Sequence, residues 1–258
     1  MNTLNKIIES KKQELQVLEN KTPIEVLRAK HKNFKRANML KALTSDVISV
    51  IAEIKQKSPS EGIINKTNDP VEIAESYENN GAAAISVLTD NPFFGGSIEL
   101  LSKIKSSVQI QILRKDFIIS EYQVYESYLH GADALLLIAD ILEYSVLESL
   151  YEKAMEIGLK VLVEAHSMSA IKKVKKLKPE ICGVNSRNLE TMEIDLKWFE
   201  TSYHHLPETS IKIAESGIHS NEHVRFVDTI GYDAILVGTS LMNKDNPGLA
   251  IPQFLDGQ

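Results

Sequence analysis

The sequence predicts an α/β fold in which eight parallel strands, each followed by a helix, close into one (β/α)8 barrel. Short apolar runs alternate with amphipathic stretches along the chain without a break in composition, as a series of βα units requires. These runs lack a clean polar alternation, which is typical of strands that are buried on both faces. A chain of 258 residues also has the length of a one-domain barrel.

The predicted strands and helices follow one another in regular order. The apolar runs predicted as strands are 48–54, 82–88, 108–113, 134–139, 161–163, 181–184, 211–214 and 234–237. The amphipathic stretches predicted as helices are 70–79, 97–104, 121–129, 144–157, 168–177, 196–203 and 221–229. An open, doubly wound sheet is the structural alternative. Such a sheet usually carries a glycine fingerprint after its first strand, and this sequence has none.

A helical extension is expected at residues 1–45, followed by the barrel at residues 46–258, and together they are expected to form a single domain. One apolar stripe at helical spacing runs through residues 3–20 and consists of Leu4, Ile7, Ile8, Leu15 and Leu18. A second helix begins at Thr22 and Pro23, because threonine is a good N-cap and proline suits the first helical position. The stripe predicts that the first helix packs over the barrel.

Composition excludes several classes of protein. The net charge of -6 argues against a general affinity for nucleic acid, although it leaves room for a local basic pocket that binds a small anion. The single cysteine, Cys182, excludes an internal disulfide framework and suits a reducing cytoplasm. No apolar run resembles a signal-peptide core or reaches the roughly 20 residues that span a bilayer. We expect a cytoplasmic monomer that binds neither nucleic acid nor membranes.

Polar side chains stand at the C-terminal ends of the predicted strands. In chain order they are Glu53, Lys55, Thr89, Asp90, Lys115, Asp140, Glu164, Asn185, Arg187 and Glu215. Each of them alone is compatible with a solvated strand end, since charged side chains are mostly exposed. The C-terminal ends of all strands in a barrel meet at one mouth, so a set of this size favours an active site there.

Strand alternation predicts which of these side chains point into the barrel. Lys115 and Glu164 each share a face with an apolar residue two positions earlier, so both are expected to point inward. A lysine that is partly desolvated, or that lies near other cations, loses its proton more easily and can act as an acid near neutrality. Lys115 and Glu164 are therefore a candidate acid and base. The alternative is that they, or Glu53 and Lys55, form a salt bridge that only closes the barrel.

Small residues with free backbone N–H groups follow the last two predicted strands, namely Ser216, Gly217, Gly238, Thr239 and Ser240. Barrels commonly bind a phosphate at these two loops, against the N-terminus of a short helix. Lys55 and Ser58, from the first strand and its loop, are next to them around the closed ring. For either loop alone, the alternative is a tight turn that small residues permit. The two loops together favour a phosphate site.

The sequence contains no motif for a metal or a cofactor. His219 and His223 are four residues apart, but no third ligand stands at a matching spacing, and we interpret both as solvated surface residues. A Walker loop and a dinucleotide fingerprint are both missing. We therefore predict that the protein uses neither a metal nor a cofactor.

A series of motifs at the strand ends resembles, in the same order along the chain, those of indole-3-glycerol-phosphate synthase, a TIM-barrel enzyme of tryptophan biosynthesis. The motifs are Glu53-x-Lys55-x-x-Ser58-Pro-Ser-x-Gly62, Phe93-Phe94-Gly-Gly, Leu113-Arg-Lys115-Asp-Phe117, Val163-Glu164-Ala-His166, Gly183-Val-Asn185-Ser-Arg187, Ala214-Glu215-Ser216-Gly217 and Val237-Gly238-Thr239-Ser240. The similarity extends over residues 45–245, and the helical segment before it fits the extra N-terminal helices of the family.

The resemblance implies a substrate, 1-(o-carboxyphenylamino)-1-deoxyribulose 5-phosphate, that is converted to indole-3-glycerol phosphate, carbon dioxide and water without a cofactor. It implies that Lys115 is the general acid and Glu164 the general base. It also implies that Lys55 meets the substrate carboxylate and shares acid duty, while Glu53 tunes Lys55. The remaining residues that the resemblance places at the site are Asn185, Glu215, Ser58, Phe94, Phe117, Arg187, Ser216, Gly217, Gly238 and Thr239.

Two positions depart from the family pattern. The family often has asparagine where this chain has Ser186, and a basic residue where it has Glu61. Neither position is a principal acid or base, so the departures bear on substrate affinity more than on the type of reaction. Two other functions are compatible with the same barrel, namely a phosphoribosyl-sugar isomerase and a non-catalytic barrel that binds a phosphate ligand. The isomerase would need a differently placed acid–base pair, and the non-catalytic barrel would need none.

Overall fold

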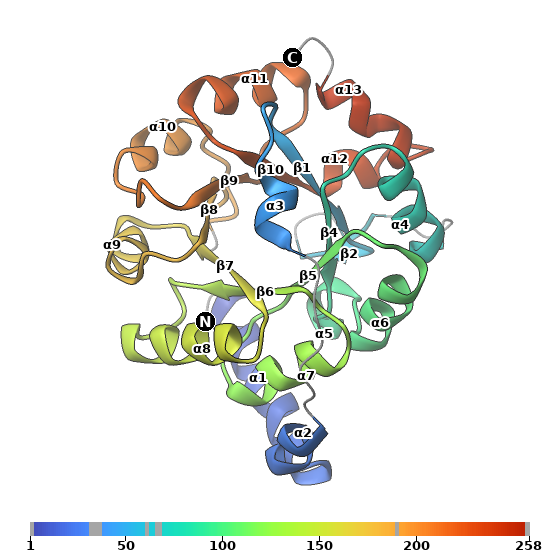
Figure 1. Ribbon diagram of the computed structural model, residues 1–258, viewed down its shortest axis with the longest axis vertical. Helices are drawn as coiled ribbons and strands as arrows, with labels where there is room; N and C mark the ends of the chain where they lie inside the picture. The colour runs from blue at the N-terminus through green and yellow to red at the C-terminus, as the bar shows by residue number, and fades with distance from the viewer. Residues whose placement is uncertain (1–2, 31–37, 60–61, 65–68, 189–190, 256–258) are drawn as a thin grey trace.

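The computed structural model of the chain describes residues 3–30, 38–59, 62–64, 69–188 and 191–255. Eight parallel strands close into a barrel in the order β1-β10-β9-β8-β7-β6-β5-β4, and helices surround it (Figure 1). The barrel strands are β1 Ser49–Ile54, β4 Ala84–Leu88, β5 Gln111–Lys115, β6 Ala134–Ile138, β7 Lys160–Ala165, β8 Ile181–Asn185, β9 Ile211–Glu215 and β10 Ala234–Val237. The predicted (β/α)8 fold is confirmed.

Several of the helices that follow these strands begin at a capping side chain. The helices after β1 are α4 Pro70–Asn79, α5 Asn91–Phe94, α6 Ile98–Ser107, α7 Glu121–Leu129, α8 Tyr144–Glu156, α9 Met168–Leu177, α10 Lys197–Tyr203, α11 Asn221–Ile230, α12 Thr239–Met242 and α13 Ile251–Leu255, with a 3-10 turn at Gly248–Ala250. Ser97, Ser120, Ser167 and Ser220 each accept a backbone N–H from the first turn of the helix that follows. Gly231 ends α11 in the left-handed region.

The third strand of the prediction is shifted along the chain. It was expected at 108–113, whereas β5 spans Gln111–Lys115. The reason is Val108, which belongs to the end of α6, where its N–H bonds to Ile104. The shift makes Lys115 the last residue of its strand, paired in register with Leu88 of β4. The sequence analysis also did not anticipate a small antiparallel pair after β1, formed by β2 Lys57–Ser58 and β3 Gly62–Ile63.

The N-terminal end of the barrel is closed by α3, Met39–Leu43. Figure 1 shows this short helix across the centre of the strand ring. Its Met39 and Leu43 are fully buried and belong to the same apolar cluster as Ile51 and Ile213, inside the barrel. Since α3 fills this end, a pocket inside the barrel must open at the opposite end, where the polar strand ends lie.

The first two helices are α1 Thr3–Lys21 and α2 Ile24–Lys30. The apolar stripe of α1 packs against the barrel as predicted, with Ile7 and Leu15 buried. One turn from each of these lies Lys11, which sequence analysis left out of the stripe although it is only 2% exposed. Lys11 Nζ lies 3.1 Å from Asp116 Oδ1 and 3.3 Å from Asp90 Oδ2. These two carboxylates follow β5 and β4, so α1 packs beside the mouth of the barrel. Within the described ranges, no helix is long and apolar enough to cross a membrane.

Candidate active site

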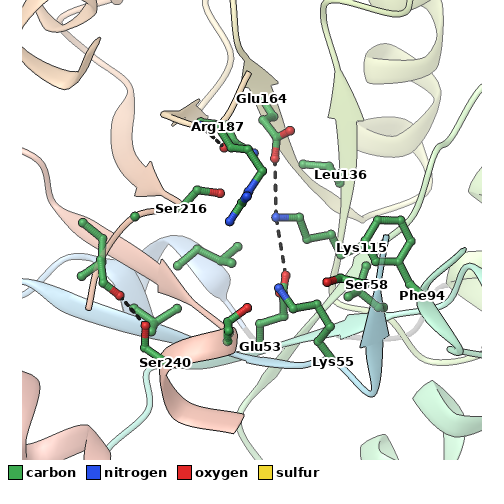
Figure 2. Close-up of a pocket in the computed structure, with 18 of the residues that line it drawn as sticks. Glu53, Lys55, Ser58, Phe94, Lys115, Leu136, Glu164, Arg187, Ser216 and Ser240 are labelled. Atoms are coloured by element: carbon green, nitrogen blue, oxygen red, sulfur yellow. Dashed lines mark hydrogen bonds and ion pairs between the residues drawn. The ribbon is translucent and has the colours of Figure 1, made fainter. Parts of the chain in front are cut away.

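A pocket opens at the C-terminal ends of the strands, and Figure 2 shows the side chains that converge on it. It collects nearly every residue that sequence analysis placed at the site, namely Glu53, Lys55, Ser58, Phe94, Lys115, Phe117, Glu164, Asn185, Arg187, Ser216, Gly217, Gly238 and Thr239. The exception is Glu215, which is fully buried beneath the pocket lining. The structure brings these side chains together at one mouth, apart from Glu215.

Lys115 lies among three carboxylates. Its Nζ is 2.8 Å from Glu215 Oε2, 3.5 Å from Glu53 Oε2 and 3.6 Å from Glu164 Oε2, and Figure 2 shows it between the last two. Burial alone lowers the pKa of an ammonium group, but attraction to Glu215, Glu53 and Glu164 outweighs burial and raises the pKa of Lys115 well above its usual range. The expectation that Lys115 loses its proton easily is wrong for this arrangement. The side chain is a protonated ammonium group.

The carboxyl groups of Glu164 and Glu215 have opposite protonation behaviour. Burial would raise the pKa of Glu164, but attraction to Lys115 and His166 lowers it well below its usual range. Burial and the neighbouring charge of Glu164 raise the pKa of Glu215 to about 8, despite Lys115. Glu164 is thus ionised at neutral pH, while Glu215 holds a proton. Glu164 Oε2 and Glu215 Oε1 are buried oxygens that receive no hydrogen bond from an N–H or hydroxyl group of the described residues.

Glu53 and Lys55 form the second charged pair of the pocket. Lys55 Nζ lies 3.1 Å from Glu53 Oε1, so the pairing expected from strand alternation is present. Burial would raise the pKa of Glu53, and attraction to Lys55 and Lys115 outweighs burial and lowers it. A salt bridge that only closes the barrel needs one anion per cation, whereas Lys115 contacts carboxylates from three other strands. The arrangement favours a site that handles charge and protons over a simple closing contact.

The loops after β9 and β10 line one side of the pocket. Ser216 and Gly217 both have positive φ angles, 68° and 75°, so this turn brings their backbone close to the pocket. Thr239 begins α12, and the first N–H groups of any helix are not used inside it. His219, which we interpreted as a surface residue, is exposed, but it lies at the rim of the pocket, where its Nδ1 is 2.6 Å from Ser240 Oγ.

Two aromatic rings line the opposite part of the pocket. Phe94, from α5, and Phe117, after β5, have ring centroids 6.0 Å apart and planes inclined by 34°. Asp116 Oδ1 accepts the backbone N–H of Phe117 at 2.8 Å, which fixes the position of that ring. The rings of Phe94 and Phe117 give the pocket an apolar wall that suits a flat aromatic group.

The loop after β8 contributes Asn185 and Arg187. Asn185 Oδ1 accepts the backbone N–H of Arg187 at 3.0 Å, and the Arg187 guanidinium points into the pocket in Figure 2. Ser186, one of the two departures from the family pattern, donates its hydroxyl to the carbonyl of Ser216 and so joins this loop to the next. Glu61, the other departure, lies outside the described residues.

Sequence analysis missed His166 as a site residue. Its Nε2 lies 2.5 Å from Glu164 Oε1, and its Nδ1 lies 2.9 Å from the carbonyl oxygen of Arg187. The available signal was its spacing of two residues from Glu164, which places both side chains on one face at the end of β7. Lys11, which forms ion pairs with Asp90 and Asp116, was missed because a lysine in an amphipathic helix is usually solvated.

The comparisons with known proteins agree with this geometry. The model of the indole-3-glycerol phosphate synthase family matches residues 4–254. The chain belongs to this family. It is 41% identical over 256 residues to the indole-3-glycerol phosphate synthase of Campylobacter jejuni subsp. doylei, covering 98% of this chain and 99% of that protein. It is 43% identical over 254 residues to that of Priestia megaterium, covering 97% of this chain and 96% of the relative.

Solved structures that resemble this barrel share its fold at low sequence identity. A thiamine phosphate pyrophosphorylase from Pyrococcus furiosus superposes with a TM-score of 0.62 at 16% identity, over 84% of this chain and 96% of that one. A 3-hexulose-6-phosphate synthase from Salmonella typhimurium superposes with a TM-score of 0.64 at 12% identity, over 80% of this chain and 96% of that one. At this identity the likeness shows the barrel alone, and the family assignment comes from the sequence matches.

Proposed function

We propose that this chain is a carboxy-lyase of tryptophan biosynthesis that performs the reaction of its family. It converts 1-(o-carboxyphenylamino)-1-deoxyribulose 5-phosphate to indole-3-glycerol phosphate, carbon dioxide and water. The observation that carries the proposal is the convergence of Lys55, Lys115 and Glu164 on one pocket that also has an aromatic wall and two small-residue loops. The alternatives, a phosphoribosyl-sugar isomerase and a non-catalytic phosphate-binding barrel, do not account for the two lysines and the aromatic wall together.

In the first step the ring carbon that bears the carboxylate attacks the C2 carbonyl of the sugar chain. A carbon–carbon bond forms, and the carbonyl π electrons move to oxygen. Lys115 donates a proton to that oxygen, and its three carboxylate neighbours keep it charged for this role. Phe94 and Phe117 hold the aromatic ring of the substrate between them and Lys115.

In the second step the bond between the ring and its carboxylate breaks. Its electron pair returns to the ring and restores aromaticity, and carbon dioxide leaves. Lys55 meets the substrate carboxylate before this step, and Glu53, 3.1 Å away, fixes the position of the Lys55 ammonium. The apolar walls of the pocket favour loss of a charged carboxylate as a neutral gas.

In the third step Glu164 removes a proton from C1 of the sugar chain. The C–H electron pair becomes the C1–C2 double bond, and the C2 hydroxyl leaves as water with a proton from Lys55, because Lys115 gave its proton in the first step. Glu164 is ionised in the structure, as a base must be, and lies across the pocket from the phosphate-side loops. Asn185, which lines the pocket, binds a substrate hydroxyl or the amine, whereas Glu215, expected in the same role, lies beneath the lining and acts through its hydrogen bond with Lys115.

The substrate phosphate binds at the loops after β9 and β10. Ser216, Gly217, Gly238 and Thr239 face the pocket there, and Ser58 lines the same pocket from the loop after β1. Backbone N–H groups at such loops are standard phosphate ligands in barrels. Arg187, whose guanidinium enters the pocket from the β8 loop, adds positive charge to this anionic substrate.

The same features support a proposal for the assembly and location of the protein. All described residues that line the pocket come from one barrel, which supports a monomer, and α1 packs onto the barrel through Ile7, which supports one domain made of residues 1–45 and 46–258. The only cysteine, Cys182, is buried inside β8, where burial raises the pKa of its thiol to about 12. A buried, unreactive thiol is compatible with a reducing cytoplasm.

The direct test is to add the carboxyphenylamino substrate to the purified protein and follow indole fluorescence and carbon dioxide release. We expect both to appear in equal amounts. Conversion of a phosphoribosyl sugar without release of carbon dioxide would favour the isomerase instead. Substrate binding by calorimetry with no turnover would favour the non-catalytic barrel.

A further inference from the structure

The two oxygens of Glu164 have different surroundings. Oε1 lies 2.5 Å from His166 Nε2. Oε2 lies 3.6 Å from Lys115 Nζ, beyond hydrogen-bond distance, and receives no N–H or hydroxyl group from the described residues. One oxygen is therefore committed to the protein, while the other is directed to the side where Lys115 enters the pocket.

The orientation of the His166 ring is fixed by two further contacts. Its Nδ1 lies 2.9 Å from the carbonyl oxygen of Arg187, and its backbone N–H donates to Asp140 Oδ2 at 2.8 Å. A carbonyl oxygen only accepts hydrogen bonds, so Nδ1 must carry a hydrogen. The side chain is only 6% exposed, so solvent does not compete with these contacts.

A count of hydrogens then limits the charge of the pair. The contact between Nε2 and Oε1 needs a hydrogen of its own, in addition to the one on Nδ1. Either the ring is an imidazolium facing a carboxylate, or it is a neutral imidazole facing a carboxylic acid. The groups around the pair are Lys115 from β5, Glu215 from β9, Asp140 after β6 and the Arg187 carbonyl after β8.

These neighbours favour the imidazolium. Burial lowers the pKa of His166, but attraction to Glu164 and Asp140 outweighs burial and raises it. Lys115 favours the ionised form of Glu164, whose pKa is lowered. The proton between Nε2 and Oε1 therefore belongs to the ring, and Glu164 remains a carboxylate.

We propose that His166 is a positioning residue for Glu164: as an imidazolium it holds Oε1 and leaves Oε2 as the oxygen that takes the proton from the substrate. The proposal rests on the proposed function, in which Glu164 is the base of the dehydration step. Only the C–H bond breaks, its electron pair stays with the substrate, and the proton goes to Oε2. The same ring ties the base to the backbone of Arg187, so the two pocket side chains keep a fixed relative position.

The kinetic test compares His166→Gln with His166→Ala. Glutamine can still donate an N–H to Oε1 but carries no charge, whereas alanine removes both the donor and the charge. We expect His166→Ala to lower kcat by about 10- to 100-fold, less than the loss of the base itself, with KM changed far less. We expect His166→Gln to recover most of kcat at high pH.

The pH profile separates a positioning role from a merely structural one. Without the imidazolium, the carboxylate of Glu164 loses a favourable charge and its pKa rises. A base must be ionised to act, so the acidic limb of kcat should move to higher pH by about one unit or more in both variants. The matched control is His130→Gln, because His130 contacts Ser102 outside the pocket. Its acidic limb should stay in place, and an unmoved limb in both His166 variants would overturn the proposal.

A second measurement does not depend on turnover. Nitrogen NMR of the ring of His166, in the protein without substrate, should show hydrogens on both Nδ1 and Nε2 at pH 7. A bare Nε2 at that pH would overturn the proposal even if the enzyme makes indole-3-glycerol phosphate. If the protein makes no product but both nitrogens carry hydrogens, the proposed function fails, while the imidazolium pair stands as a structural feature.

Discussion

Lys115 Nζ donates a hydrogen bond to Glu215 Oε2 at 2.8 Å, and this contact joins β5 to β9 on the opposite side of the closed ring. Glu215 reaches this position because β8 carries glycine beside it, at Gly183. A Cβ atom at Gly183 would collide with Glu215 Oε1. The charged centre of the pocket thus depends on a residue that has no side chain.

Replacing Lys115 by alanine should lower kcat by about 10^2- to 10^4-fold, because a positioned general acid contributes that much to rate. Steady-state kinetics on the indole product measures the loss, and circular dichroism checks that the fold is kept. Lys55→Ala is the matched comparison, since both lysines line the pocket. A near-normal kcat for Lys115→Ala together with a lost kcat for Lys55→Ala would mean that the acid roles of the two lysines are reversed.

Glu164→Gln should slow dehydration specifically. Glutamine keeps the shape of the side chain but cannot take a proton, so ring closure and loss of carbon dioxide should still occur. Rapid mixing with two readouts should show carbon dioxide before indole fluorescence. Simultaneous appearance of the two at the wild-type rate would show that Glu164 is not the base.

The buried Glu215 should make the stability of the protein depend on pH. Its pKa rises from 4.5 to about 8 on folding, so between these values the folded protein holds a proton that the unfolded chain has lost. The free energy of unfolding from this group is therefore largest below about pH 4.5 and declines as the pH rises through about 8. Glu215→Gln is always neutral, so its Tm should fall less than that of the wild type across this window. Parallel Tm curves would contradict the raised pKa.

Lys11→Met should destabilise the protein strongly. Methionine keeps the apolar stem in place but leaves Asp116 and Asp90 with one cation fewer, and removing one partner of a buried ion pair costs about 3–5 kcal/mol. Asp116 also holds the backbone of Phe117, so KM should rise as well. The control is Lys12→Met, because Lys12 is 60% exposed and its pair with Glu9 should contribute less than about 1 kcal/mol. Equal urea midpoints for the two variants would refute the role of Lys11.

Gly238→Ala should damage both substrate binding and the charged centre. A Cβ atom at this position would collide with Glu53 Oε1, which pairs with Lys55. Glu53 must move or the loop must shift, so we expect kcat to fall together with a higher KM. A phosphate ion titrated into the variant should also bind more weakly than to the wild type. Gly158→Ala is the control for a destabilising glycine replacement away from the pocket: a Cβ there meets no atom within 4 Å, but the φ of 88° strains alanine, so stability should fall while KM stays unchanged.

Strand alternation was sufficient to predict the inward side chains of the site. Lys115 and Glu164 point into the pocket because side chains alternate strictly along their strands. Arg114, which alternation directs out of the barrel, contacts Glu126 of α7. Strand alternation could not predict that Glu215 is buried beneath the residues that line the pocket. Its position depends on the space left by Gly183 on the neighbouring strand. The raised pKa of Lys115 was also not predicted, because it depends on the positions of three carboxylates from other strands.

The contacts of His166 and Lys11 depend on single atoms brought together by the fold. His166 follows a strand and is close in sequence to Glu164, but its second contact, with the Arg187 carbonyl, is made across a loop. Lys11 is in a helix whose other lysines are exposed. It differs from them only because it lies against Asp90 and Asp116, which follow β4 and β5. Sequence periodicity predicts which face of a helix or strand a residue lies on. The roles of His166 and Lys11 depend on which groups of other elements lie opposite that face.

The order of the strands has a consequence for how the protein folds. Lys115 is synthesised before Glu164 and Glu215, and Glu53 lies beside the seam where β1 meets β10, the last strand of the ring. In a chain that has folded only as far as β6, Lys115 lacks two of its carboxylate partners, Glu164 and Glu215. The loops after β9 and β10 that line the pocket are also not yet in place. Closing of this seam and the recovery of activity should therefore be one kinetic event during refolding, with activity lagging behind helix formation.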